Sequence, residues 1–373
     1  MVSCQKIKIG IIIDSGNVGG VQKIAIEEVK ILNKLGYFTK LLVMDKNSSL
    51  NINKHYSEYL FPKSLPKIKL YPFDFLTFNH LLCNINPMSI LRLKAYDIVI
   101  AHNIIATILP LISQKLTGKP KKIVLYYHDT AYSIIQLYFG SFLIKGLVKI
   151  LEKYIIKYCD LIIANSDLTA EIIKETYKFK PSVIYPGAKY KRTTKKDKKY
   201  DILFVTRWNK RRNLELIIKI AKKFPFYNVV MAGIWSSNND KNTFVERIKK
   251  KKITNIIIID KYLSENELIA LYQVSKIYVQ TEPVAFGMGA LEAFMNCCLP
   301  IVWEKSGISY LFNKENLSEF IVSNERQLLE RVDIFVRKFF RLSKEKEKIR
   351  EILRKKYSWE SHAKKILYEI LSI

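Results

Sequence analysis

The sequence is poor in glycine and proline, the residues that are abundant in many non-globular proteins. Glycine (13 of 373 residues) and proline (11) are too sparse for a collagen-like or linker-rich protein. Hydrophobic residues make up 49% of the chain, which excludes an intrinsically disordered one. At about 100–200 residues per domain, the length suits two domains, each large enough to bury a core.

Cysteines and long apolar runs are scarce too. Five cysteines without a Cys-x-x-Cys pair predict neither a disulfide framework nor a zinc site, and free thiols are typical of a reducing compartment. The most apolar segment, residues 97–114, contains His102, Asn103 and Pro110 and is shorter than the about 20 apolar residues of a membrane span. The N-terminus leads into a strand-like run without a signal-peptide cleavage site. We therefore expect a cytoplasmic protein.

Acidic residues are few relative to basic ones. Asp and Glu number 34 against 62 Lys and Arg, which gives a formal net charge of +28. Such a charge favours an anionic partner, such as nucleic acid, phospholipid or a phosphorylated substrate. The alternative is a set of solvated, lysine-rich helix faces. The basic clusters come with no aromatic stacking motif, zinc spacing or known nucleic-acid module, so a plain DNA-binding protein fits poorly.

Short apolar runs alternate with helix-like segments along the whole chain, which is typical of βαβ units and parallel sheets. We expect strands at residues 7–13, 39–44, 96–101, 122–127 and 161–164, and again at 201–205, 229–233, 256–259, 277–280 and 300–303. A basic run separates the two sets. The sequence thus predicts two tandem Rossmann-like, doubly wound parallel-sheet α/β domains, with an N-terminal domain over 1–188, a basic linker over 189–199 and a C-terminal domain over 200–350.

Ligands of open parallel sheets bind beyond the carboxyl ends of the strands, so the loops there are candidate sites. The first loop contains Gly19 and Gly20, which let a phosphate approach the backbone and the next helix; an ordinary strand–helix turn is the alternative. The second carries four basic residues within 207–212, just before a helix. Because cations oppose the dipole at a helix N-terminus, this cluster indicates an anion site, such as a diphosphate site.

The third loop follows the strand at 277–280 and opens a helix at a glycine-containing turn, 286–289. Glu292 falls about one and a half turns into that helix. A carboxylate there can accept hydrogen bonds from ribose hydroxyls while the helix N-terminus binds a phosphate. A solvent-facing helical glutamate is the alternative.

This third segment resembles the signature of the family-four retaining glycosyltransferases. In it, Phe286-Gly287 is followed by Glu292-Ala293, a turn of small residues and Pro300. Further matches, in the family's order, are Gly19-Gly20, Tyr127-His128-Asp129, Cys159–Ser166, Val183–Gly187, Arg207 with Arg212, and Tyr357–Glu360. The order and spacing of these matches together are specific.

The resemblance implies the GT-B architecture, in which the two domains face a cleft and a C-terminal helix, 351–373, crosses back to the N-terminal domain. The N-terminal domain would bind the acceptor and the C-terminal domain the nucleotide sugar. The implied reaction moves a hexose, with retention, from a nucleotide-diphosphate sugar to a hydroxyl of a lipid, a glycan or a protein-linked glycan. A UDP-sugar is the expected donor, with a GDP-sugar next, and no cofactor is implied. Because no Asp-x-Asp pair occurs, we expect a metal-independent enzyme without a metal site.

The resemblance also implies roles for individual residues. Arg207 and Arg212 would hold the diphosphate, and His128 would contact a sugar hydroxyl. Glu282 stands two residues before Val284, which occupies the place of the family's first glutamate. The implied catalytic residues are His128, Arg207, Arg212 and Glu282. The implied donor-binding residues are Gly19, Gly20, Arg207, Arg212, Phe286, Gly287, Met288, Gly289 and Glu292.

Other functions and partners stay open. One is a nucleotide-sugar epimerase or hydrolase of the same fold, and another is a non-catalytic basic scaffold that binds an anionic membrane or nucleic acid. Lysines recur every four residues over 145–157 in an otherwise apolar helix, which favours either peripheral binding to the cytoplasmic membrane face or packing on the sheet. Four histidines have no ligand spacing and are interpreted as surface or packing residues: His55, His80, His102 and His362. The sequence does not predict the oligomeric state.

Overall fold

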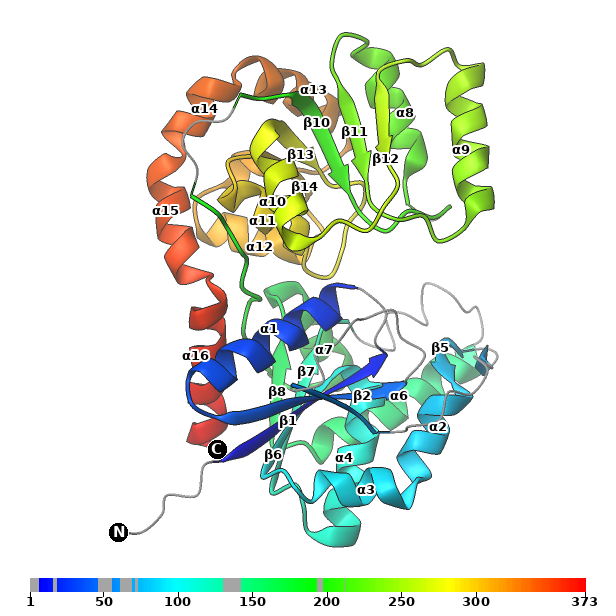
Figure 1. The fold of residues 1–373 in the computed structure, drawn as a ribbon, viewed down its shortest axis with the longest axis vertical. Helices are drawn as coiled ribbons and strands as arrows, with labels where there is room; N and C mark the ends of the chain where they lie inside the picture. Colours follow the sequence, from blue (N-terminus) through cyan, green and yellow to red (C-terminus); the bar gives the residue numbers. More distant parts are fainter. Residues whose placement is uncertain are drawn as a thin grey trace. The chain divides into compact units, whose positions relative to one another are not determined.

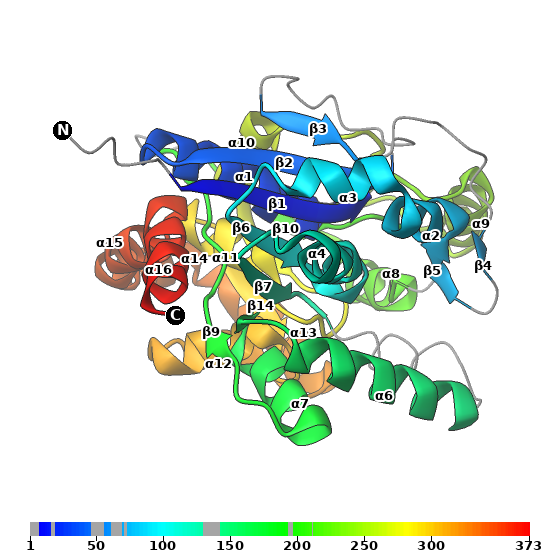
Figure 2. The same ribbon diagram turned by 90° about the horizontal axis from the view of Figure 1, so that it is seen from below.

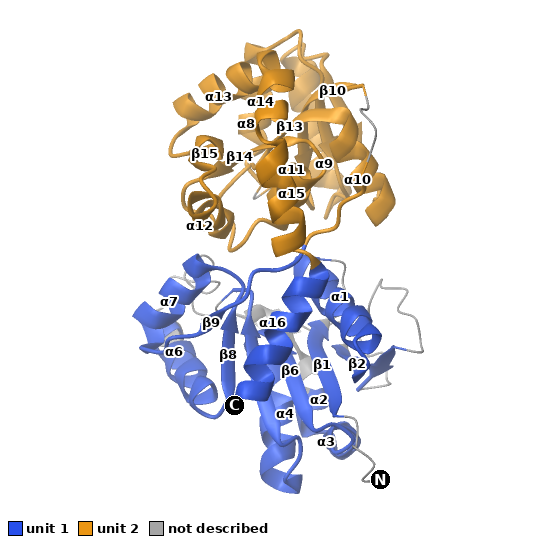
Figure 3. Ribbon diagram, turned by 90° about the vertical axis from the view of Figure 1, so that its left-hand side faces the viewer, with its two compact units in different colours: residues 1–187, 359–373 blue, residues 188–358 orange. Residues whose placement is uncertain are grey.

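Two units make up the chain. A computed structural model describes residues 7–15, 19–45, 56–60, 69–70, 73–129, 142–192, 197–210 and 212–373. Unit 1 comprises Met1–Gly187 and Trp359–Ile373, and unit 2 comprises Ala188–Ser358 (Figure 3). Each unit contains its own parallel sheet with flanking helices, so the predicted fold class is confirmed.

The sheet of unit 1 has seven described strands, all parallel, in the order β3-β2-β1-β6-β7-β8-β9 (Figure 1). Their bounds are β1 Lys8–Ser15, β2 Phe38–Asp45, β3 Ser57–Tyr59, β6 Ile98–His102, β7 Lys122–Tyr127, β8 Leu161–Ala164 and β9 Ser182–Val183. In β1, Ile11 pairs with Leu41 of β2 and Ile100 of β6. The β1 isoleucines are buried, because helices cover a parallel sheet on both faces, and the strand therefore reads as a continuous apolar run.

Helices connect these strands (Figure 2). They are α1 Gly20–Lys34, α2 Phe78–Ile85, α3 Pro87–Leu93, α4 Asn103–Thr117, α6 Phe142–Lys157, α7 Asp167–Tyr177 and α16 Trp359–Ser372, beside an antiparallel pair, β4 Lys69–Leu70 and β5 Phe73–Thr77. Helix α1 packs on β1 and β2 and against α16, and α4 packs on β6 and β7. Strand β6 continues directly into α4 through Asn103, whose φ of 66° lies in the left-handed region that asparagine tolerates. His102 therefore stands at the carboxyl end of the sheet.

Unit 2 repeats the pattern with six described strands in the order β12-β11-β10-β13-β14-β15. The strands are β10 Tyr200–Val205, β11 Val229–Ala232, β12 Ile256–Ile259, β13 Ser275–Val279, β14 Leu299–Trp303 and β15 Ile321–Val322. The helices are α8 Leu214–Lys223, α9 Asn238–Lys250, α10 Glu265–Val274, α11 Met288–Met295, α12 Gly307–Lys314, the 3-10 helix η1 Ser318–Phe320, α13 Glu325–Arg337, α14 Phe339–Glu345 and α15 Glu347–Lys356.

Each sheet has a switch point, where the strand order reverses. It lies between β1 and β6 in unit 1 and between β10 and β13 in unit 2. Ligands of such sheets bind at these switch points.

The chain passes between the units twice, at 187/188 and at 358/359. Within unit 1, Gly187 lies against Trp359 so closely that a Cβ on Gly187 would come within 2.6 Å of the Trp359 backbone. The returning segment is shorter than the expected 351–373, because α15 belongs to unit 2 and only α16 to unit 1.

Where the structure describes it, the basic segment 189–199 makes specific contacts within unit 2. The backbone of Lys189 and Lys191 is hydrogen-bonded to the Asn296 side chain, at 2.9 and 3.1 Å. The Lys198 ammonium donates to three carbonyls, those of Gln273, Ser275 and Cys297, at 2.7–2.8 Å. The Lys198 ammonium and the Asn296 side chain therefore hold this segment within unit 2, which the number of lysines does not predict.

Candidate active site

In unit 2 the loop after β10 carries the exposed Arg207 and is held in place by a tryptophan. Trp208 is fully buried, and its Nε1–H donates to the Ala232 carbonyl at 3.2 Å. Gly233 follows β11 with a φ of +125°, and a Cβ there would lie 2.0 Å from the carbonyl oxygen of Thr206. The loop therefore packs tightly on the end of β11, which requires glycine at 233.

Arg212, at the end of the same loop, forms an ion pair with Glu282 from the loop after β13. Strands β10 and β13 are neighbours, so both side chains reach the switch point of the sheet. Arg212 Nε–H also donates to the Arg207 carbonyl at 3.4 Å. The sequence analysis assigns the Arg212 guanidinium to a diphosphate. A guanidinium has five N–H donors, and in the structure Glu282 and the Arg207 carbonyl accept from two of them. Arg211 lies outside the described residues.

A polar groove of about 570 Å³ opens beside Arg212 within unit 2. Its lining is Lys210, Arg212, Asn213, Leu214, Glu215, Asp240, Thr243, Phe244 and Arg247. Three of these side chains are cationic and two are anionic, so the groove can hold a polar ligand with an anionic group near Arg212.

The turn before α11 depends on a glycine. Gly287 has a φ of +102°, and a Cβ there would lie 3.0 Å from the Ile308 side chain and 3.1 Å from Gln280 Nε2. Gln280 is fixed, because its Oε1 accepts from Ser306 Oγ at 2.9 Å and from Trp303 N at 3.1 Å. No side chain caps the start of this helix at Gly287, and an uncapped helix N-terminus can bind a phosphate.

Glu292 is 5% exposed, so the solvent-facing alternative is wrong. Burial raises the pKa of both Tyr272 and Tyr278, and the negative charge of Glu292 raises it further, which places this carboxylate near both phenols. Tyr278 Oη also lies 3.0 Å from where a Cβ on Gly289 would be, so the helix packs closely on β13 at that glycine.

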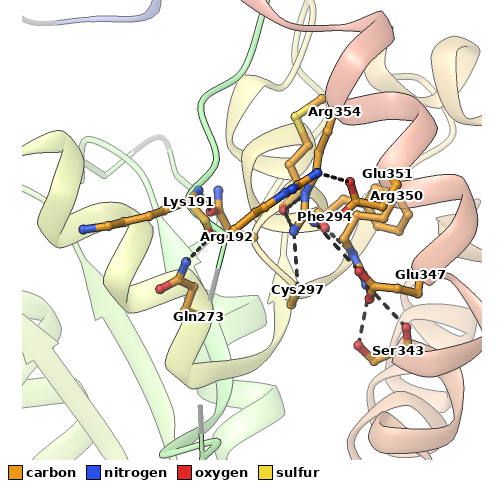
Figure 4. A network of polar contacts seen from close by, with 12 residues as sticks. Lys191, Arg192, Gln273, Phe294, Cys297, Ser343, Glu347, Arg350, Glu351 and Arg354 are labelled. Atoms are coloured by element: carbon orange, nitrogen blue, oxygen red, sulfur yellow. Dashed lines mark hydrogen bonds and ion pairs between the residues drawn. The ribbon is translucent and has the colours of Figure 1, made fainter. Parts of the chain in front are cut away.

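Two arginines of α15 hold the other end of α11 (Figure 4). Arg350 is fully buried, and its Nε–H donates to the Phe294 carbonyl at 2.9 Å; Arg354 Nε–H donates to the Met295 carbonyl at 2.9 Å. Cations that bind the last carbonyls of a helix stabilise it through its dipole. The sequence analysis missed both residues, since nothing in a heavily charged helix separates them from solvated arginines.

In unit 1, His128 lies at the end of β7 in a cluster of buried polar side chains. His128 Nε2 is 2.7 Å from His102 Nδ1, and His102 Nε2 is 2.9 Å from Glu28 Oε2. Glu28 Oε1 is 2.8 Å from His362 Nε2. Of the two interpretations of His102 and His362, surface or packing, the surface one is wrong: both are buried and share one carboxylate. His55 lies outside the described residues, as does the side chain of His80.

Glu28 was missed by the sequence analysis. It lies on the buried face of α1 with Ala25 and Leu32, and a charged residue in that apolar stripe was the available signal. Burial by itself raises the pKa of the Glu28 carboxyl, but His102 and His362 outweigh it and hold the pKa at about 2. Burial lowers the pKa of His128 well below its usual value. Glu28 is thus ionised and His128 neutral at physiological pH.

The first loop is described from Gly19 on. Gly19 is the uncapped residue before α1 and Gly20 is the first residue of the helix, so the N-terminus of α1 resembles that of α11. Residues 16–18 lie outside the described part of the chain. The anion-binding role of Gly19 and Gly20 stays a prediction.

Among the residues that the structure describes, no group of three or more His, Cys, Asp or Glu side chains is arranged to hold a metal ion. None of the described helices is long and apolar enough to cross a membrane.

Two family models match the chain in succession. The model of Glycosyltransferase Family 4 matches residues 18–192, and the model of glycosyl transferases group 1 matches residues 188–356. The chain belongs to the group 1 glycosyltransferases. No curated protein sequence matches this glycosyltransferase at a significant level.

Solved structures share the fold of this glycosyltransferase at low sequence identity. Sucrose-phosphate synthase from Thermosynechococcus elongatus superposes with a TM-score of 0.74 at 14% identity, over 98% of this chain and 99% of that one. A glycosyltransferase from Rickettsia africae gives 0.71 at 20% identity, over 98% and 97%. HepE from Anabaena in complex with UDP gives 0.76 at 12% identity, over 98% and 100%. The fold of this glycosyltransferase is of the GT-B type.

Proposed function

We propose that this glycosyltransferase moves a hexose from a nucleotide-diphosphate sugar to a hydroxyl of a lipid, glycan or protein-linked glycan, with retention and without a metal ion. The observation that carries the proposal is that Arg212 and the uncapped N-terminus of α11 follow neighbouring strands at the switch point of the unit 2 sheet. HepE, which has the same fold, is solved with UDP and with UDP-glucose. A UDP-sugar is accordingly the first donor to test, and a GDP-sugar the second.

The diphosphate is the leaving group, and its developing negative charge is what the site stabilises. In this proposal Arg207 and Arg212 bind its oxygens, and the backbone of Phe286, Gly287, Met288 and Gly289 donates to phosphate and sugar. Glu282 orients Arg212 through their ion pair. Glu292 accepts hydrogen bonds from the ribose hydroxyls. On unit 1, Gly19 and Gly20 offer backbone N–H groups, and His128 binds a sugar hydroxyl.

A thermal-shift screen against UDP-, GDP- and ADP-sugars tests the donor. A ligand at about 100 times its Kd stabilises the native state by about 2.7 kcal/mol, which raises the Tm by roughly 5–10 °C in a domain of this size. Arg212→Ala removes a charged hydrogen-bond partner and is expected to weaken donor binding about 10- to 100-fold. The matched control is Arg326→Ala, which removes an exposed arginine of unit 2 that pairs with Glu330. Equal donor affinity in the two variants would refute the site.

Transfer itself is tested with labelled donor and candidate acceptors. NMR of the product gives the anomeric configuration, and retention is expected. Activity should survive a chelator, because arginines and a helix N-terminus neutralise the diphosphate in place of a metal ion. Loss of activity with the chelator and recovery with Mg²⁺ would contradict the metal-independent mechanism. Release of free sugar with no acceptor would instead favour a hydrolase.

We also propose that the enzyme binds an anionic membrane surface through α6. The lysines of this helix recur every four residues: Lys145, Lys149, Lys153 and Lys157. Large apolar side chains of the same helix and its end are exposed beside them: Leu147, Ile150, Leu151, Tyr154 and Tyr158. An apolar groove of about 830 Å³ between α4 and α6 adjoins this face and is large enough for part of an acyl chain. The one acidic residue of α6, Glu152, is buried and accepts from the Tyr127 hydroxyl at 3.1 Å. The helix thus combines a packed inner face with an apolar and cationic outer face, which suits an anionic leaflet.

Sedimentation with phosphatidylglycerol vesicles and with phosphatidylcholine vesicles tests this surface. Each lysine near an anionic bilayer contributes about 1 kcal/mol, so replacing Lys149 and Lys153 by Gln should weaken binding roughly 30-fold. The matched control replaces Lys249 and Lys250, at the end of α9 in unit 2, by Gln. Equal binding to both kinds of vesicle, or equal loss in both variants, would contradict the proposal.

A further inference from the structure

Four side chains and one backbone carbonyl form a continuous row inside unit 1. The Tyr185 carbonyl oxygen is 2.9 Å from His362 Nδ1, and His362 Nε2 is 2.8 Å from Glu28 Oε1. Glu28 Oε2 is 2.9 Å from His102 Nε2, and His102 Nδ1 is 2.7 Å from His128 Nε2. Every one of these side chains is at most 5% exposed, so water does not replace these contacts.

The protons in this row can be counted from one end. A carbonyl only accepts, so His362 Nδ1 carries a proton. An ionised carboxylate also only accepts, so the Nε2 atoms of His362 and His102 both carry protons. His362 is therefore an imidazolium, and its charge balances that of Glu28.

His102 is neutral, because a second imidazolium beside one carboxylate would leave an unbalanced charge in a buried site. Since its Nε2 carries a proton, its Nδ1 is unprotonated. The 2.7 Å contact to that bare nitrogen needs a donor, and His128 Nε2 supplies it. His128 is neutral, so its Nδ1 carries no proton and accepts hydrogen bonds.

The ring and backbone of His128 are held from several sides. Its ring lies nearly parallel to that of His102 and meets it edge to edge through the two nitrogens, with centroids 4.9 Å apart and planes 8° apart, and its centroid lies 4.5 Å from that of the Tyr126 ring. Its backbone N–H donates to Asn103 Oδ1 at 2.8 Å, and its carbonyl accepts from Asn165 Nδ2 at 3.1 Å. These contacts oppose a rotation of the ring about χ2, which would put Cε1 in the place of Nε2 beside His102.

We infer that Glu28 is a positioning residue that acts through His102 to hold His128 in its Nε2–H tautomer, with Nδ1 presented as a hydrogen-bond acceptor. The tautomer follows from the row itself. The role of His128 Nδ1, which would accept a hydrogen bond from a hydroxyl of the donor sugar, rests on the proposed function. The alternative tautomer would offer a donor at the same position, and it would select a different hydroxyl geometry.

NMR of the full-length protein with ¹⁵N-labelled histidine tests the tautomer, and the chain has only five histidines to assign. In the unmodified protein we expect one protonated nitrogen, Nε2, in His128 and two in His362. A protonated Nδ1 with a bare Nε2 in His128 would overturn the inference, and this result needs no variant.

Two substitutions of Glu28 test its part in the row. In Glu28→Gln the amide oxygen accepts from His102 and the amide nitrogen donates to His362, so His128 keeps its tautomer and His362 loses one proton. In Glu28→Leu no acceptor is left for His102, and His128 should become a mixture of tautomers. An unchanged His128 signal in Glu28→Leu would refute the role of Glu28. If that variant does not fold, His102→Phe, which separates Glu28 from His128, is expected to give the same mixture.

Activity supplies the second readout. Glu28→Leu should lower kcat/KM for transfer by about tenfold or more, with Glu28→Gln retaining more activity than Glu28→Leu. The matched control is Glu360→Leu, which removes an exposed glutamate of α16 that pairs with Lys364. A loss in the control as large as that in Glu28→Leu would refute a specific effect. If the NMR tautomer is as expected but no nucleotide sugar is a donor, the proposed function fails while the role of Glu28 stands.

Discussion

Replacing Arg350 by Met tests whether α15 holds the candidate donor-binding helix in place. Arg350 is fully buried, its Nε–H donates to the Phe294 carbonyl at 2.9 Å, and its guanidinium lies 5.2 Å from the Phe294 ring centroid. Methionine fills similar apolar volume but donates no hydrogen bond. The charged hydrogen bond contributes about 1.5–3 kcal/mol and the ring contact about 0.5–1 kcal/mol, so a loss of about 3 kcal/mol is expected.

Urea unfolding followed by circular dichroism measures this loss, and a Tm lower by roughly 6–12 °C should accompany it. Since α11 carries Glu292 and the N-terminal turn that binds phosphate in our proposal, donor affinity should fall with it. The matched control is Arg341→Met, because Arg341 is exposed on α14 and pairs with Glu345; it should cost less than about 0.5 kcal/mol. Equal losses in the two variants would show that Arg350 is not a structural link between α15 and α11.

Three further outcomes are expected, two from single positions and one from His128 and Glu28 together. Cys297 ends α11 with a φ of 61°, where glycine is less strained, so Cys297→Gly should exceed Cys297→Ala in unfolding free energy by about 1 kcal/mol; a less stable glycine variant in urea unfolding would contradict this. Gly187→Ala should destabilise by about 1–3 kcal/mol, because its Cβ would lie 2.6 Å from the Trp359 backbone, and an unchanged Tm would refute that contact. Acid should destabilise unit 1 in two steps. The pKa of His128 is lowered from 6.5, so its contribution is lost as pH falls below 6.5, at up to about 1.4 kcal/mol per pH unit. The pKa of Glu28 is lowered from 4.5 to about 2, so its contribution of about 3 kcal/mol is present above pH 4.5 and lost as pH falls through 2. Urea unfolding between pH 7.5 and 3 measures the first step and the beginning of the second below pH 4.5. A His128→Phe variant with the slope of the unmodified protein near pH 6 would disprove the first step.

Three strands of the fold were predicted to the residue. The predicted bounds 122–127, 161–164 and 256–259 are those of β7, β8 and β12. Buried parallel strands are continuous apolar runs and amphipathic helices have a 3.6-residue period, and both patterns depend only on neighbouring residues. The predicted strand at 96–101 is shifted in the structure to Ile98–His102, because Asn103 starts α4 directly.

The candidate site was predicted in part. The three loops that the sequence analysis selected do follow strands at the switch points, because loop positions follow from the strand pattern. The ion pair between Arg212 and Glu282 was not predicted, since it depends on β10 lying next to β13. The burial of Glu292 was left open, because one helical position does not show which face the sheet covers.

By itself the sequence determined two parallel-sheet units, their loops and the family of the chain. The units and loops follow from the local periodicity of apolar residues, and the family follows from the order and spacing of short sequence motifs. Only the tertiary structure decided which polar groups are buried together. Glu28 meets His102 across 74 positions and His362 across 334, and Arg350 meets the Phe294 carbonyl across 56. The packing of the sheets and helices brings such partners together. The low dielectric around them then shifts their pKa values and so determines which groups are protonated and which are charged.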